Sequence, residues 1–401
     1  MSMSGHPILA HVVLGYSPMI DRDRTVTATR LTVFPVRPDA PLDAGALLAA
    51  IDQVWPEAGG KVSLNVLSET LLTDLLKARP SANLMLEVPA FMACNPAHSA
   101  SIQALHGRGN TLLIKGRPRI DLPRDVLPCF KHSIIDLEDE RRVDAQAPAG
   151  VVREITHVQS GVRSLEQLDA SFKRGAVAVL GWPIDDVVRP HAGGQVQSDM
   201  STIVELMRRI DKEESIERLE DTLKLDPTLA FKLLRYINSP AFGLRVEVAS
   251  FRHALMLLGY TRLKRWLAVL LASASKDRDM KPVMFAALRR GLLMEELART
   301  SAGAADEQMR SEAFICGVFS LLDRMMKQPF AELLRAVPVP DSVRQVLVDG
   351  QGPYQPMLEV VRAVENESLY DVRESAERLL LGVAEINRAV LRALAQAVQI
   401  Q

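Results

Sequence analysis

The chain has 401 residues and a mass of 44.2 kDa, which is enough for two or three domains of ordinary size. Hydrophobic residues make up 48% of it and charged residues 24%, the composition of a globular protein, which excludes disordered and fibrous classes. The 48 Lys and Arg residues nearly balance the 49 Asp and Glu residues, so the basic excess typical of proteins that bind nucleic acid or anionic membranes is absent. We therefore expect no nucleic-acid partner.

Cysteine usage and hydropathy indicate the compartment. The three cysteines, Cys94, Cys129 and Cys316, are far apart and form no C-x-x-C pair, which argues against a disulfide framework or a thiolate zinc site. The first twenty residues lack a basic stretch followed by an apolar run, and no window reaches the ~20 apolar residues of a spanning helix. The sequence predicts a cytoplasmic protein without a membrane span.

The first half of the sequence alternates short β-rich runs with helical stretches. The runs cover residues 25–34, 61–66, 84–88, 111–114, 132–135, 150–157 and 176–180. Helical patterns over 43–54 and 68–77 fall between them. Repeated strand and helix predicts a parallel sheet or a (β/α) barrel.

The periodicity changes at the segment VVRPHAGGQVQSD, residues 187–199. Beyond it, nearly every segment is an amphipathic helix. Apolar residues recur at helical spacing in two stripes, Ile203, Leu206, Met207 and Ile210, and Leu263, Trp266, Leu267, Leu270 and Leu271. We therefore expect an α/β domain over residues 1–188, a linker over 189–198 and an all-α domain over 199–401.

A short motif marks the start of the all-α half. Asp226 and Pro227 begin a helix, and the stretch from Asn238 to Gly243 stops it in a tight loop. A second helix begins at a Ser cap and ends at a Gly in the left-handed conformation. The loop suits both a purely structural role and a surface for a partner protein. The motif comprises Asp226, Pro227, Asn238, Ser239, Phe242, Gly243, Ser250 and Gly259.

This motif resembles the HDOD domain, a non-catalytic relative of the HD-type metal phosphohydrolases. The resemblance covers roughly residues 195–390. It implies that residues 312–329 lie where a catalytic HD domain carries its His-Asp pair, and Ser320 and Leu321 stand there instead. From the linker onward the only histidines are His191 and His253, too few for a dinuclear metal site.

The first half resembles the EAL domain, the cyclic-di-GMP phosphodiesterase fold, in several segments of matching order. These are YSPMID at 16–21, VSLNVLS at 62–68, LMLEV at 84–88, the stretch 159–168 and LGWP at 180–183. The resemblance implies a TIM-type barrel in which Asn65 and Glu87 occupy two metal-binding positions.

Other functional positions of that family carry different residues in this sequence. The signature Glu falls at Thr29, and the adjacent Asp pair falls near Ile114 and Lys115. The catalytic Lys aligns with Ile134, which leaves only the following Asp136. The late Glu residues align near Ser160 and Arg163, and the Gln aligns near Leu180.

These replacements argue against metal-dependent hydrolysis. A two-metal phosphodiesterase holds each cation with several oxygen ligands, and Asn65, Glu87 and Asp136 are too few to supply them. Lys115 would repel a cation or take its place. We therefore predict no catalytic residue, no metal and no other cofactor.

The surviving polar residues have two interpretations. Asn65 can satisfy backbone groups, and Glu87 can pair with Lys115 or an arginine; alternatively, both retain contact with an ion or a nucleotide. Asp136 begins an acidic run, which is typical of a solvated surface.

An EAL-like barrel followed by an HDOD domain resembles the YuxH-type signalling proteins. The resemblance implies a bacterial regulator related to cyclic-di-GMP signalling. Our first hypothesis is a non-enzymatic adaptor that contacts other signalling proteins, with self-association left open. The second is a sensor that binds cyclic-di-GMP without cleaving it, and the third is a weak phosphodiesterase.

Overall fold

The structure is a computed structural model. It describes residues 6–38, 40–55, 60–118, 120–142, 155–186, 198–224, 229, 237, 248, 251–272, 277–302, 307–337 and 339–400. The chain divides into two compact units. The barrel unit contains Met1–Asp186, Arg362–Glu377 and Leu381–Leu391, and the helical unit contains Val187–Val361, Arg378–Leu380 and Arg392–Gln401.

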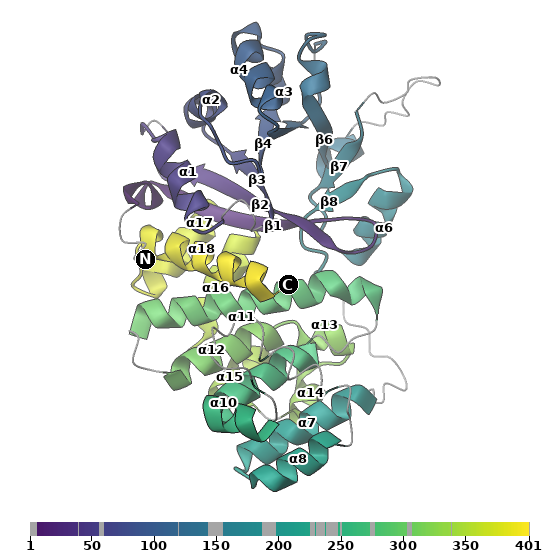
Figure 1. Ribbon diagram of the computed structural model, residues 1–401, viewed down its shortest axis with the longest axis vertical. Coiled ribbons are helices and arrows are strands. Elements are labelled where there is room, and N and C mark those ends of the chain that lie inside the picture. The colour runs from purple at the N-terminus through teal and green to yellow at the C-terminus, as the bar shows by residue number, and fades with distance from the viewer. Residues whose placement is uncertain are drawn as a thin grey trace. The chain divides into compact units, whose positions relative to one another are not determined.

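Eight strands of the barrel unit form one closed barrel in chain order (Figure 1). Strand β1 is antiparallel to both of its neighbours, β2 and β8, and every other neighbouring pair is parallel. The strands are β1 (Val12–Ile20), β2 (Val26–Pro35), β3 (Lys61–Val66), β4 (Leu84–Pro89), β5 (Thr111–Lys115), β6 (Phe130–Asp136), β7 (His157–Ser160) and β8 (Ala178–Leu180).

The predicted barrel is therefore confirmed, with two differences in its strands. Strand β1 was not among the predicted runs, because its nine residues are all buried and show no alternation of polar and apolar positions. Strand β7 begins at His157, where the predicted run 150–157 ends; residues 150–154 lie outside the described residues.

Helices follow most of the parallel strands, and side-chain caps mark several of their starts. They are α1 (Ala44–Asp52), α2 (Glu69–Lys77), α3 (Ala90–Ala93), α4 (Pro96–Gly107), α5 (Leu137–Arg142) and α6 (Leu165–Lys173). Asp43, Ser68, Asn95 and Ser164 each accept a backbone N–H bond from the first turn of the helix that follows.

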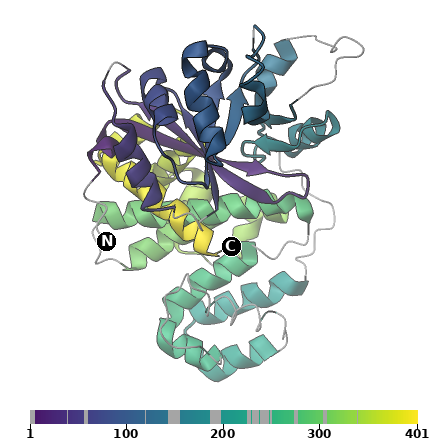
Figure 2. The same cartoon turned by 45° about the horizontal axis from the view of Figure 1, so that its top comes forward.

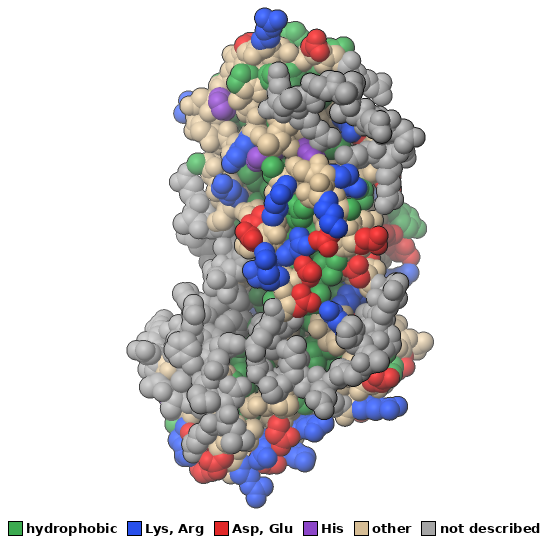
Figure 3. Space-filling view, turned by 90° about the vertical axis from the view of Figure 1, so that its right-hand side faces the viewer, with side chains coloured by type: hydrophobic (Ala, Val, Ile, Leu, Met, Phe, Trp, Pro, Cys, Tyr) green, Lys and Arg blue, Asp and Glu red, His purple; other side chains and the backbone are tan. Residues whose placement is uncertain are grey.

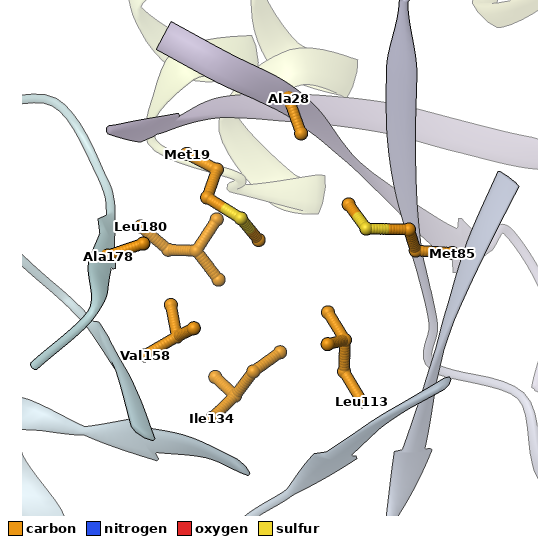
Figure 4. Close-up of a cluster of buried hydrophobic side chains, with 8 residues drawn as sticks. All are labelled: Met19, Ala28, Met85, Leu113, Ile134, Val158, Ala178 and Leu180. Carbon is orange, nitrogen blue, oxygen red and sulfur yellow. The ribbon is translucent and has the colours of Figure 1, made fainter. Parts of the chain in front are cut away.

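The barrel interior is filled by apolar side chains that point toward a common centre (Figure 4). Because side chains alternate along a strand, this layer fixes which positions face inward further along each strand. The layer consists of Met19, Ala28, Met85, Leu113, Ile134, Val158, Ala178 and Leu180. Beyond this layer, at the carboxyl ends of the parallel strands, polar side chains line the barrel mouth together with Phe34.

The last part of the chain covers strand β1. Strands β1 and β2 form a hairpin, so no helix follows β1 to cover it. Helix α17 (Leu369–Arg378) and the first part of α18 (Val383–Ile400) take that place (Figures 1 and 2). The side chain of Asn387 is fully buried there; it accepts a bond from Leu14 N at 3.0 Å, and its Nδ2 donates to Leu9 O at 2.8 Å and Val12 O at 2.6 Å.

The division of the chain therefore differs from the expected one. We expected residues 199–401 to form one domain, whereas residues 362–377 and 381–391 group with the barrel and cover the side of β1 that has no helix of its own. The expected linker 189–198 lies outside the described residues apart from Ser198, which begins α7.

The described elements of the helical unit are helices, as the sequence predicts. They are α7 (Ser198–Asp211), α8 (Ile216–Lys224), α10 (Phe251–Ala272), α11 (Lys281–Ala302), α12 (Glu307–Phe319), α13 (Leu322–Met326), α14 (Phe330–Ala336), α15 (Asp341–Arg344) and the start of α16 (Gln355–Glu365). Both predicted apolar stripes, on α7 and on α10, are buried.

No helix among the described residues is long and apolar enough to cross a membrane. On the face shown in Figure 3, the described Lys and Arg side chains are interspersed with Asp and Glu.

Candidate functional site in the barrel mouth

A cavity of about 780 Å³ opens at the mouth of the barrel. Its floor is formed by polar residues from the strand ends, and its rim carries Leu67 and Phe91, which are 46% and 63% exposed. The polar floor comprises Arg30, Thr32, Asn65, Lys115, Asp136 and Ser160. In TIM barrels this end of the strands holds the functional site.

Glu87 on β4 is held by Arg30 on β2. The guanidinium Nε donates to Glu87 Oε1 at 2.9 Å and Nη2 donates to Oε2 at 2.7 Å, and Ser63 Oγ also donates to Oε1 at 2.8 Å. The Glu87 side chain is 0% exposed and that of Arg30 is 10% exposed. Burial by itself lowers the pKa of Arg30, but the charges of Glu87 and Glu367 outweigh it and raise that pKa. Both carboxylate oxygens of Glu87 are therefore committed to a permanent cation.

Lys115 on β5 contacts the other surviving position, Asn65 on β3. Lys115 Nζ donates to Asn65 Oδ1 at 2.9 Å, and Asn65 Nδ2 donates to Thr32 Oγ1 at 3.2 Å. Burial and the nearby Arg30 lower the pKa of Lys115 below its usual range. Of the two partners predicted for Glu87, Lys115 or an arginine, the structure shows the arginine, Arg30. Lys115 instead donates a hydrogen bond to Asn65.

Asp136 ends β6 and begins α5. Its Oδ2 accepts a bond from Ser160 Oγ at 3.0 Å, and its Oδ1 accepts one from Glu138 N at 2.9 Å. Asp136 is half-buried and lines the cavity, and its bond to Glu138 N lies at the start of α5. Its two local bonds give it a structural role in the mouth.

The remaining predicted positions divide by the direction of their side chains. Arg30 faces the mouth, so the neighbouring Thr29 lies on the other face of β2. Lys115 also faces the mouth, so its neighbour Ile114 lies on the other face of β5. Ile134 and Leu180 belong to the apolar interior. Arg163 is exposed and its Nε donates to Asp185 Oδ2 at 2.8 Å.

Glu367 belongs to the site but was not predicted from the sequence. Glu367, on the turn between α16 and α17, lines the cavity; its Oε1 accepts a bond from Ser17 Oγ at 3.0 Å, and its Oε2 lies 3.9 Å from Arg30 Nη1. No local pattern could have found it, because 350 residues separate it from Ser17.

The donors at this mouth do not fit the metal centre that the EAL resemblance implies. Glu87 is neutralised by Arg30, the oxygen of Asn65 is occupied by an ammonium, and two cationic side chains stand on the floor of the cavity. Among the described residues, no group of three or more His, Cys, Asp or Glu side chains is placed to hold a metal ion.

In the helical unit, most of the predicted motif lies outside the described residues: Asp226, Pro227, Asn238, Ser239, Phe242, Gly243 and Ser250. Gly259 is described, and its φ of +71° breaks α10 into two helical halves, as the sequence predicts. Ser320, in the segment where the HD pair was expected, is buried; its Oγ accepts a bond from Arg290 Nη1 at 3.1 Å and donates to Gly317 O at 2.7 Å.

Comparison with known proteins identifies the helical part: residues 197–332 match the HDOD domain family. The chain contains an HDOD domain. The resemblance seen in the sequence motif is therefore confirmed, and this HDOD domain follows the closed barrel.

Two curated bacterial proteins are similar to the chain. The uncharacterized protein YuxH of Bacillus subtilis is 28% identical over 184 residues, and the cyclic di-GMP phosphodiesterase CdgJ of Vibrio cholerae is 26% identical over 176 residues. Each alignment covers 44% of this chain, and the chain spans 43% and 40% of the two relatives' lengths. The predicted likeness to YuxH is confirmed.

Among solved structures, the FimX EAL domain from Pseudomonas aeruginosa bound to c-di-GMP covers 44% of this chain, and the match covers 90% of that chain. Its sequence identity is 13% and its TM-score 0.30.

Proposed function

We propose that the protein is a non-enzymatic adaptor related to cyclic-di-GMP signalling, and that it acts through contacts with other signalling proteins. The observation that carries this proposal is the pair of cations in the barrel mouth. Arg30 pairs with both carboxylate oxygens of Glu87, and Lys115 donates to the side-chain oxygen of Asn65. The oxygens that would bind a metal in an EAL domain are therefore already occupied.

The chemistry supports this reading. Hydrolysis of a phosphodiester by a two-metal centre needs two cations a few ångströms apart, each with several oxygen ligands. A site whose buried carboxylate is already paired gains little by exchanging a guanidinium for Mg²⁺. The similarity to the cyclic di-GMP phosphodiesterase CdgJ supports the connection to cyclic-di-GMP signalling.

The proposal is tested by incubating the full chain with cyclic-di-GMP and Mg²⁺ or Mn²⁺ and following the nucleotide by chromatography. The expected result is intact nucleotide at every metal concentration. The matched control is the variant Lys115→Gln, which removes the ammonium but restores no carboxylate, and it should also leave the nucleotide intact. Metal-dependent cleavage by the unaltered chain would contradict the proposal.

A second candidate function is a sensor that binds cyclic-di-GMP without cleaving it. The volume of the cavity favours this candidate, because about 780 Å³ lies within the range of ligand pockets. Arg30 and Lys115 supply positive charge for phosphates, and the exposed ring of Phe91 on the rim offers an apolar surface for a base. Saturable binding with intact nucleotide distinguishes the sensor from an adaptor that binds no nucleotide.

A further inference from the structure

The turn between α16 and α17 reaches into the barrel mouth. We call residues Asn366, Glu367 and Ser368 the corner. Asn366 and Glu367 line the same cavity as the strand ends, although the chain reaches them through the whole helical unit. The corner is thus part of the site and comes from the far end of the sequence.

The carboxylate of Glu367 lies beside Nη1 of Arg30, the guanidinium nitrogen that does not bond to Glu87. Glu87 accepts from Nε and Nη2 of the guanidinium, while Oε2 of Glu367 lies 3.9 Å from Nη1, an ion-pair distance longer than a hydrogen bond. The other oxygen of Glu367 accepts from Ser17 Oγ at 3.0 Å. The Glu367 side chain is 21% exposed and lines the cavity, so a ligand in the cavity can reach it.

The backbone of the corner lies close to β1. Glu367 has a φ of +54°, the left-handed conformation that commonly ends a helix, and two backbone bonds end α16 there: Glu367 N donates to Val364 O at 3.2 Å and Ser368 N donates to Ala363 O at 3.1 Å. Gly15 lies directly beneath it, where a Cβ would come within 3.0 Å of Glu367 Cγ and 3.1 Å of its Cα. The absence of a side chain at Gly15 is what lets the corner sit this close to the strand.

We propose that Glu367 is an exchangeable anion, supplied by the chain, that closes the barrel mouth. A phosphate-bearing ligand that enters the cavity takes the position beside Arg30 and Ser17 and displaces the corner. Residues 355–361 of α16 belong to the helical unit, so the displaced corner is covalently continuous with it. The inference rests on the proposed function only in taking the mouth as a site without catalytic metals.

The test uses calorimetric titration of the full chain with two probes, pyrophosphate and cyclic-di-GMP. In Glu367→Gln, either probe should bind about tenfold more tightly than in the unaltered chain, the ratio that corresponds to one charge-assisted hydrogen bond. Gly15→Ala should shift affinity in the same direction by a steric route, so one variant remains informative if the other does not fold. The control is Glu377→Gln, an exposed carboxylate on the same α17, which should bind like the unaltered chain.

A second readout follows the corner itself. Amide hydrogen exchange over residues 362–372 of the unaltered chain should rise when either probe binds. Equal affinities of Glu367→Gln and Glu377→Gln, unchanged exchange on binding, or absence of binding to every variant would each overturn the proposal. If Glu367→Gln binds only cyclic-di-GMP more tightly than the unaltered chain does, the ligand is a nucleotide. If it binds both probes more tightly, a phosphate group is sufficient for binding. Cleavage of the recovered nucleotide would contradict the proposed function, but the affinities of Glu367→Gln and the unaltered chain for pyrophosphate could still be compared.

Discussion

The buried pair of Arg30 and Glu87 gives a prediction whose size follows from the structure. Replacing Arg30 by Met removes two hydrogen bonds of 2.9 and 2.7 Å and leaves Glu87, whose side chain is 0% exposed, with Ser63 as its remaining partner among the contacts at this position. Breaking a buried ion pair on one side costs about 3–5 kcal/mol, because the other charge stays buried without compensation.

The double replacement measures how much of this loss comes from the interaction between Arg30 and Glu87 and how much from their contacts with other residues. Arg30→Met with Glu87→Met exchanges both charges for apolar side chains of similar length, which is often nearly neutral in a well-packed site. We therefore expect the double variant to recover about 2–4 kcal/mol of the loss.

Urea denaturation measures these free energies of unfolding. The chain has three tryptophans, two of which, Trp55 and Trp182, are buried in the barrel unit. A Trp266→Phe background, used for every variant, confines the fluorescence signal to that unit. If Arg30→Met unfolds within 1 kcal/mol of its parent, or if the double variant loses as much as the sum of the single ones, the reasoning about this pair is refuted.

Three further predictions concern other parts of the molecule. Asn387→Leu should destabilise the barrel unit by about 3 kcal/mol or more, because it leaves buried backbone groups of the β1 region unpaired; urea denaturation checks this, and a loss below 1 kcal/mol contradicts it. Burial raises the pKa of Glu296 above its usual range, so stability should fall as pH rises from that usual value to the raised one, and Glu296→Gln should lack this fall in Tm; parallel profiles of Tm against pH would refute it. Arg30→Glu combined with Lys115→Asp places new carboxylates beside Glu87, and calorimetry should then detect Mn²⁺ binding; a folded variant that takes up no Mn²⁺ would show that the geometry is wrong.

Periodic patterns in the sequence were sufficient for the architecture. The strand and helix alternation predicted a parallel sheet or a barrel, and the resemblance to the EAL domain implied the barrel. The stripes that begin at Ile203 and Leu263 predicted which faces of α7 and α10 are buried. These inferences succeed because helix and strand place apolar residues at fixed spacings.

The register within strand β2 was harder to predict. Arg30 faces the mouth, and Thr29, where we placed the signature position, lies on the opposite face of β2, because neighbouring strand residues face opposite sides. Six consecutive residues of β2 are buried, so hydrophobic alternation gives no sign of which face is inward. A charged residue within that buried run was the available signal.

Contacts between distant parts of the chain were not predictable. Glu367 and Asn387 follow strand β1 by about 350 residues or more, and their roles depend on a hairpin that leaves β1 without a helix of its own. Local propensity contains no information about which distant helix fills such a gap.

We propose that internal ion pairs occupy the barrel mouth in place of a metal centre. The most direct test is a calorimetric titration of the full chain with cyclic-di-GMP in the presence of Mg²⁺, followed by recovery and chromatography of the nucleotide. We expect the nucleotide to be recovered intact, with or without a heat of binding. Recovery of the linear, hydrolysed dinucleotide, dependent on Mg²⁺ and on Glu87, would contradict this proposal.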